Sequence, residues 1–267
     1  MNRVTAPFGR RAVVVTGREA HGAYVVIGGR DTSGPRPKPG QFYMLTAAER
    51  WGGGAGERPF LPRAFSVLRA HAGELRFLIE DVGPGTRRLC ELRPGDGLLL
   101  VGPLGNGFAP PREGRAPLLV GGGIGIAPLA IWQDELGEGA TALAGFRDAA
   151  HAAGAALLAE ATVATDDGSV GHHGLVTELL EDELAGRADD VEVYACGPPP
   201  MLEAVRETCS DHGVPAQLAL ESGMACGFGA CFGCVVPTVD GYIRLCVDGP
   251  VLDAAKLETA LVAGAGH

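Results

Sequence analysis

The chain has 267 residues, enough for two domains and an appended segment, and its 46% hydrophobic and 20% charged residues are typical of a soluble globular protein. A net charge of −10 argues against nucleic acid as a partner, because phosphate binding needs a basic surface. The charge is uneven, +6 over residues 1–108 and −16 over 109–267, so the N-terminal part could hold an anionic ligand or an acidic partner, or present a merely solvated basic surface.

The cysteine usage and the absence of a signal-peptide segment or a membrane-spanning segment predict a cytoplasmic protein. Four of the seven cysteines fall in one motif, a pattern that favours a reducing compartment. Residues 1–11 contain no apolar run of the kind found in a signal peptide. No stretch of 18 apolar residues predicts a membrane span. We therefore expect neither a membrane nor a nucleic acid as a partner.

Short apolar or alternating runs, separated by glycine and proline, fill the first hundred residues. Evenly spaced short strands of this kind predict a closed antiparallel β-barrel. The six strands are expected at residues 11–16, 23–27, 41–46, 64–69, 75–80 and 97–101. A glycine-rich loop is expected at 47–61, with no role predicted for its tip at 51–56, and one helix at 85–92.

Two motifs on the predicted barrel carry groups that suit a flavin nucleotide. Arg63-Ala64-Phe65-Ser66 offers a guanidinium for phosphate, an aromatic face for a planar ring and a hydroxyl. Gly83-Pro84-Gly85-Thr86 opens the predicted helix, where free N–H groups make an anion site. Each motif alone also fits ordinary strand or helix-cap chemistry. Together they favour a flavin nucleotide, with Leu78-Ile79-Glu80 lining its adenosine or ribityl part.

After a proline-bearing linker at 110–115, strands alternate with helices of about ten residues. This alternation predicts βαβ units and a parallel sheet covered on both faces. The strands are expected at 118–121, 141–145, 162–165, 191–195 and 217–220, and two further short strands at 234–238 and 242–246 near the C-terminus. The helices are expected after the turn at 122–128 and through residue 135, and at 149–160, 175–184 and 199–209.

Two turns of the predicted sheet suit a pyridine nucleotide. One contains Gly122, Gly123, Ile124 and Gly125 and opens a helix after the first strand, where a diphosphate could approach the backbone. The other, Cys196-Gly197-Pro198, ends the fourth strand. Alone, either is a common glycine turn. Because ligands lie at the carboxyl ends of parallel strands, the two turns are expected to face one crevice.

Two acidic stretches at the ends of neighbouring strands bear on the choice of nucleotide. Asp166-Asp167-Gly168 fits either a ribose contact or a polar turn. In Gly145-Phe146-Arg147-Asp148 a single arginine stands beside an acid, which favours NAD over NADP.

A cysteine motif near the C-terminus carries the strongest signal. Cys226, Cys231, Cys234 and Cys246 have the plant-type C-x4-C-x2-C…C spacing of [2Fe–2S] ligands. The glycines between them, Gly227, Gly229 and Gly233, are expected to supply positive φ angles and close approach to sulfur. A four-cysteine zinc site and disulfides or inert thiols remain the alternatives. Two further cysteines outside the motif are expected to pack inside helices, namely Cys90 and Cys209.

With these residues, the chain resembles the ferredoxin–NADP reductase superfamily, and within it the electron-transfer subunits of dihydroorotate dehydrogenase B. The most specific match runs from Glu221 to Cys234 and on through Arg244 to Val251. The resemblance covers nearly the whole chain and implies three parts in order. These are an FAD-binding antiparallel β-barrel at 1–110, an NAD-binding α/β domain at 111–220 and a [2Fe–2S] module at 221–267.

The resemblance assigns roles to the positions that match its motifs. For FAD these are Arg63, Ala64, Phe65, Ser66, Leu78, Ile79, Glu80, Gly85 and Thr86; for the cluster they are Cys226, Cys231, Cys234 and Cys246. One departure is Ala64, where many relatives have proline. The resemblance further implies a partner subunit with FMN that oxidises dihydroorotate, in a heterotetramer of two copies of each subunit.

The implied function is electron transfer from that partner through [2Fe–2S] and FAD to NAD+ in de novo pyrimidine (UMP) biosynthesis. No residue of this chain is predicted to act as a base on the substrate, so that chemistry is assigned to the partner. Two alternatives remain. A NAD(P)H–ferredoxin reductase or hydrogenase diaphorase-type subunit would share the architecture and differ in its partner. A non-catalytic, zinc-stabilised interaction protein would differ in its metal.

Overall fold

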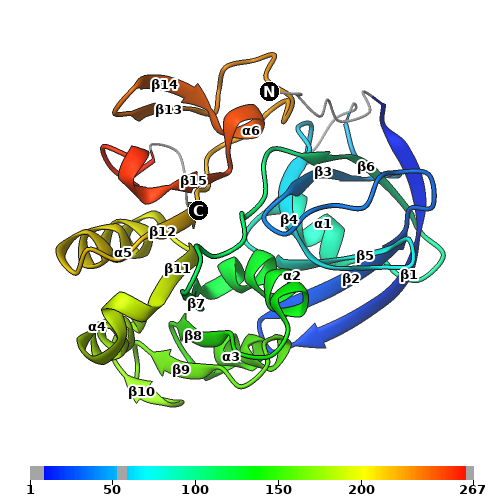
Figure 1. Ribbon diagram of the computed structural model, residues 1–267. Helices are drawn as coiled ribbons and strands as arrows, with labels where there is room; N and C mark the ends of the chain where they lie inside the picture. The colour runs from blue at the N-terminus through cyan, green and yellow to red at the C-terminus, as the bar shows by residue number, and fades with distance from the viewer. Residues whose placement is uncertain (1–8, 53–58, 263–267) are drawn as a thin grey trace.

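The computed structural model describes residues 9–52 and 59–262, and Figure 1 shows their arrangement. A β-barrel lies beside a layered α/β unit, and the cysteine-bearing segment lies against both. The tip of the predicted glycine-rich loop, at residues 53–58, lies outside the described residues.

Six strands form the closed antiparallel barrel that the sequence predicts, in the order β1-β2-β5-β4-β3-β6. Their bounds are β1 Arg11–His21, β2 Tyr24–Arg30, β3 Phe42–Ala47, β4 Arg63–His71, β5 Glu74–Glu80 and β6 Gly97–Leu104. Alternation puts every second side chain inside: Val13 and Val15 are buried while Val14 between them is exposed. Tyr43 and Phe77 fill the interior, edge to face at 5.6 Å. The helix α1, Pro84–Cys90, follows β5.

The second unit is a seven-stranded sheet in the order β10-β9-β8-β7-β11-β12-β15, and its first six strands are parallel. Their bounds are β7 Ala116–Gly122, β8 Thr141–Phe146, β9 Thr162–Thr165, β10 His172–His173, β11 Val191–Cys196 and β12 Ala216–Ala219. Helices cover both faces: α2 Ile126–Leu136 lies toward the barrel, and α4 Val176–Arg187 and α5 Pro199–Asp211 lie on the other side (Figure 1).

The prediction of one continuous α-helix at 149–160 is wrong. Only α3, Ala149–Ala152, is α-helical, and the chain then tightens into the 3-10 turn Ala153–Leu157. Gly154 lies in this turn and faces the ring of Tyr24 in the barrel; a Cβ there would come within 2.9 Å of it. Here the close packing of the sheet unit against the barrel outweighs the helix propensity of the sequence.

The C-terminal segment contains the two short strands that the sequence predicts, and also a short helix and a strand that it did not predict. β13 Val235–Thr238 and β14 Gly241–Arg244 form a hairpin, but the strand expected to reach Cys246 ends earlier, and Cys246 lies in the short helix α6, Leu245–Asp248. β15, Val251–Asp253, then joins the large sheet antiparallel to β12, and the 3-10 turn Ala254–Lys256 follows. None of the helices in the described part of the chain has both the length and the apolar character needed to cross a membrane.

Candidate functional site

A cavity of about 450 Å³ lies where the barrel, the parallel sheet and the cysteine segment meet. It receives residues from all three stretches to which the sequence assigns cofactors. The barrel and the sheet contribute Arg63, Ala64, Phe65, Ser66, Leu78, Glu80, Thr86, Ile124, Gly125 and Cys196. The cysteine segment contributes Glu221, Ser222, Gly223, Met224, Ala225 and Gly233.

The two barrel motifs predicted to hold a flavin nucleotide lie against each other. The guanidinium of Arg63 crosses the first turn of α1 so closely that a Cβ on Gly85 would lie 2.6 Å from its Nε. The same guanidinium donates to the carbonyl of Leu61 at 2.7 Å and lies 5.9 Å from the ring of Trp51. Glycine at position 85 is therefore required if a cation is to lie over the start of the helix.

Two residues predicted for the flavin site have other duties in the structure. The Thr86 hydroxyl accepts from the N–H groups of Val82 at 2.9 Å and Gly83 at 3.0 Å, so it caps α1 and orders the loop that walls the cavity. Ile79 is buried within the barrel core and is not among the residues that line the cavity.

The two glycine turns of the sheet meet as predicted at the carboxyl ends of β7 and β11. A Cβ on Gly125 would lie 2.3 Å from the carbonyl oxygen of Cys196, and one on Gly122 would lie 2.9 Å from Cδ of Pro198. Gly125 and Cys196 line the cavity, whereas Gly122, Gly123, Gly197 and Pro198 lie outside its lining.

The four motif cysteines lie close enough to influence one another. Burial opposes ionisation of Cys226, but hydrogen bonds from the backbone of Cys231 and its neighbours and from the Cys231 thiol lower its pKa to about 6. The N–H of Cys246 points at the sulfur of Cys234 at 3.5 Å, and burial together with the neighbouring Cys234 and Cys226 raises the pKa of Cys246 to about 12. Within the residues described, no three His, Cys, Asp or Glu side chains are grouped to hold a single metal ion.

The bends between the cysteines follow the glycines only in part. Gly227 and Gly229 have φ of 77° and 87°, as predicted. A side chain at Gly227 would strike Met44 of the barrel at 2.5 Å, so this bend also docks the loop. Gly233 does not have a positive φ; the left-handed residue is Phe232, at 59°, whose ring lies 5.1 Å from the guanidinium of Arg244. The positive φ expected at Gly233 is wrong because its neighbour makes the turn, whereas the expected close approach to sulfur is confirmed, with the Gly233 N–H 3.5 Å from Sγ of Cys231.

Sequence reasoning gave Glu221 and Ser222 no role, yet both line the cavity. Burial raises the pKa of Glu221 to about 7. Burial and the nearby Glu221 carboxylate raise the pKa of Cys196 well above its usual value. The hydroxyl of Ser222 is buried with no partner among the described residues. Both residues directly follow the last parallel strand, and the rule that ligands lie at such strand ends could have found them.

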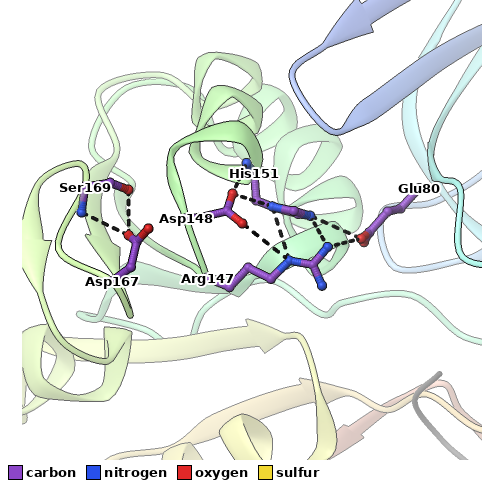
Figure 2. A network of polar contacts seen from close by, with 6 residues as sticks. All are labelled: Glu80, Arg147, Asp148, His151, Asp167 and Ser169. Carbon is purple, nitrogen blue, oxygen red and sulfur yellow. Dashed lines mark hydrogen bonds and ion pairs between the residues drawn. The ribbon is translucent and has the colours of Figure 1, made fainter.

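A network of charges ties the cavity wall to the sheet (Figure 2). Glu80, at the end of β5, accepts from Nη2 of Arg147 at 2.9 Å and lies 3.2 Å from Nε2 of His151. Asp148 caps α3 and lies 2.6 Å from Nδ1 of the same histidine, a hydrogen bond that lowers the pKa of Asp148. Nearby, Asp167 closes a polar turn by accepting from both the N–H and the hydroxyl of Ser169.

Comparison with known proteins agrees with this geometry. A model of the iron-sulfur cluster binding domain of dihydroorotate dehydrogenase B matches residues 221–258. The structure reported for an NADH-dependent reduced ferredoxin-NADP oxidoreductase superposes with a TM-score of 0.77 and 26% identity, over 94% of this chain and 91% of that one. The architecture is that of the ferredoxin–NADP reductase-type flavoproteins, as predicted.

Curated relatives narrow the class. The dihydroorotate dehydrogenase B (NAD(+)) electron transfer subunit of Caldanaerobacter subterraneus subsp. tengcongensis is 39% identical over 84% of this chain and 88% of the relative. That of Geobacillus thermodenitrificans is 40% identical over 82% and 86%. The chain belongs to the family of dihydroorotate dehydrogenase B electron transfer subunits, and the resemblance predicted from its sequence is confirmed.

Proposed function

We propose that this chain carries electrons from an FMN-containing dihydroorotate dehydrogenase subunit, through [2Fe–2S] and FAD, to NAD+ in pyrimidine biosynthesis. One observation carries the proposal: a single cavity is walled by the predicted flavin, nucleotide and cysteine segments together. Electron transfer between carriers requires that their sites be adjacent, and a shared cavity meets that requirement. The division into segments 1–110, 111–220 and 221–267 is part of the proposal.

The barrel side of the cavity fits an FAD. Phe65 and Leu78 offer apolar surface to a ring system, and Arg63 offers a cation beside the start of α1 for the diphosphate. The unpartnered, buried hydroxyl of Ser222 would gain a hydrogen-bonding partner from a polar ring edge. We therefore assign the flavin to Arg63, Ala64, Phe65, Ser66, Leu78, Ile79, Glu80, Gly85 and Thr86; of these, Ile79 supports the wall from the barrel core and Gly85 makes room for the Arg63 guanidinium, and neither lines the cavity.

The sheet side fits a pyridine nucleotide with its nicotinamide end toward the flavin. The turn at 122–125 opens into α2, and a Cβ on Gly123 would meet nothing nearer than the Tyr24 hydroxyl at 3.7 Å, so a diphosphate can approach the backbone there; Gly122 and Gly125 instead let the two turns pack together. Arg147, the arginine that follows β8, already pairs with Glu80 and Asp148. An arginine neutralised in this way gives little attraction to a 2′-phosphate, which supports NAD over NADP.

The cysteine loop fits a two-iron cluster, in which each iron takes two thiolates. The chain brings four thiols, Cys226, Cys231, Cys234 and Cys246, close enough to influence one another's pKa. Backbone N–H groups of Ala230 and Gly233 already point at sulfur, at 3.3 and 3.5 Å. Such donors stabilise thiolate charge.

The chemistry itself belongs to the cofactors: a bound flavin exchanges single electrons with an iron–sulfur cluster and electron pairs with a nicotinamide. The chain's part is to hold the sites together and to exclude water. Ala225 and Gly233 bring the cysteine loop to the cavity wall, and Gly125 and Cys196 bring the nucleotide turns to the same wall. No substrate base is assigned here, because carbon chemistry falls to the partner.

We further propose that the partner docks on the outer face of the cysteine segment, in a cytoplasmic heterotetramer of two copies of each chain. Cys231 is exposed there, and on the same segment the aromatic side chains of Phe232, its sequence neighbour, and Tyr242 are 64% and 80% exposed. Exposed aromatic side chains next to a cluster ligand suit a protein interface and shorten the path for electrons.

The test is to purify the chain alone and together with a dihydroorotate dehydrogenase catalytic subunit. Alone, it should contain iron and FAD, oxidise NADH with artificial electron acceptors and leave dihydroorotate unchanged. Together, the two should reduce NAD+ with dihydroorotate. Oxidation of dihydroorotate by the lone chain would contradict the proposal. Activity with ferredoxin and none with the dehydrogenase would instead identify a ferredoxin reductase, the activity named for the superposed structure.

A further inference from the structure

The Glu80 side chain both lines the cavity and contacts the nucleotide-binding unit. Its side chain lines the cavity assigned to the flavin, and its Oε1 atom receives both contacts from the other unit, 2.9 Å from Arg147 Nη2 and 3.2 Å from His151 Nε2 (Figure 2). A carboxylate has about four lone-pair sites. Glu80 can therefore keep these contacts and still accept from a hydroxyl in the cavity.

The residues that hold Glu80 are themselves fixed by the nucleotide-binding unit. His151 is in α3, with its side chain only 10% exposed, and its Nδ1 lies 2.6 Å from Asp148. Its ring also stands edge-on to Tyr24, the residue paired with Glu80 across β2 and β5. Arg147 leaves the end of β8 and lies against the same ring. The position of the Glu80 carboxylate thus depends on how the sheet unit sits against the barrel.

Two other ion pairs join the same units without touching the cavity. Arg69 of β4 pairs with Asp134 of α2 at 2.7 Å, and Arg36 pairs with Glu135 at 3.1 Å. None of these four residues lines the cavity. If these ion pairs did nothing but hold the two units together, breaking any one of the three would have the same effect on the cavity. The pair at Glu80 differs because its acid is part of the cavity wall.

We propose that Arg147 and His151 are positioning residues that fix the Glu80 carboxylate in the wall of the flavin cavity, so that FAD affinity depends on residues of the nucleotide-binding unit. The inference rests on the proposed flavin site. A carboxylate held by the Arg147 guanidinium, which lies against and is oriented by the His151 ring, loses little freedom when it accepts from a ligand hydroxyl. Released from this cation, it must be ordered again each time the ligand binds.

The experiment is a double-mutant cycle read out by FAD affinity and by the visible flavin spectrum of the full-length chain. Arg147→Ala should raise the FAD dissociation constant about fivefold, within the range for loss of one charge-assisted contact. The same change in a Glu80→Ala background should alter it by less than about twofold. Asp134→Ala, the matched control at the other ion pair, should stay within about twofold in either background.

The outcomes separate this inference from the proposed function. Equal effects of Arg147→Ala with and without Glu80, or an equal effect of Asp134→Ala, would overturn the inference and leave the flavin site in place. A parent chain that bound no FAD would overturn the proposed function and the inference with it. Arg147→Lys, which keeps the charge and the fold, should give an intermediate constant; a wild-type constant there together with an unfolded Arg147→Ala protein would also overturn the inference.

Discussion

The barrel and the cysteine segment are stabilised by different means. In the barrel, side chains such as Tyr43, Phe77 and Val67 are fully buried in a core that the six strands enclose. The cysteine segment has no such enclosure. Its buried residues, among them Cys234, Val236 and Leu245, belong to a core shared with the sheet and with Met44 of the barrel. Its outer face exposes Phe232, Tyr242 and a cysteine.

The two regions therefore differ in what they need in order to fold. A closed barrel satisfies its own backbone and buries its own apolar surface, so it is expected to fold without a ligand. The cysteine segment depends on contacts to its neighbours and on whatever its thiolates bind. Changes in the barrel should therefore act on global stability, and changes in the segment on cluster content.

The sharpest test of that contrast is loss of a buried cysteine in each setting. Cys234→Ala should abolish iron binding, because one iron of a two-iron cluster would lose half its protein ligands. FAD content should persist, because the barrel wall is untouched. The matched change Cys209→Ala, at a buried cysteine of α5, should keep a full complement of iron. Iron analysis and the visible spectrum measure the iron and FAD content of both variants. Equal iron loss in the two variants would show that the cysteine segment has no special role in binding iron.

In the barrel, Phe77→Ala should lower the free energy of unfolding by about 4 kcal/mol, the usual cost of emptying a fully buried aromatic site. Val14→Ala, on the exposed face of β1, should change it by less than about 0.5 kcal/mol. Denaturant unfolding followed by circular dichroism gives both values. Similar values for the two would mean that the barrel interior is loosely packed.

The junction between the two regions can be tested at Gly227. An alanine there would need a left-handed backbone and would strike Met44 at 2.5 Å, so Gly227→Ala should cost about 3 kcal/mol and reduce iron content. Gly241→Ala also requires a positive φ, but its Cβ would meet open space, so it should cost only about 1 kcal/mol. Equal losses of unfolding free energy in the two variants would show that the cost at Gly227 comes from backbone strain and not from the contact with the barrel.

The same contrast explains how much the sequence could predict. Alternating apolar residues predicted all six barrel strands, because burial on one face is a local pattern. The glycine turns at 122–125 and 196–198 were placed correctly because strand ends in a parallel sheet meet at one edge. Three features depended on distant packing and were missed: the 3-10 turn at Gly154 against Tyr24, the edge strand β15, and the role of Phe232 in the cysteine loop.

The smallest of the expected effects concerns Glu221, where the cysteine segment leaves the sheet and meets the cavity. Burial raises the pKa of its carboxyl from 4.5 to about 7, so the fold favours the protonated form. That contribution to stability is complete below pH 4.5 and is lost as the pH rises through 7. Glu221→Gln, which stays neutral, should match the parent chain near pH 4.5 and exceed it by about 2 kcal/mol at pH 8, below the roughly 3 kcal/mol that the full pKa difference gives, because the residue is only partly buried. Denaturant unfolding of the flavin-free chain across this range measures the difference. Stability curves that run parallel from pH 4.5 to pH 8 would mean that the Glu221 carboxyl is as well solvated in the folded chain as in the unfolded one.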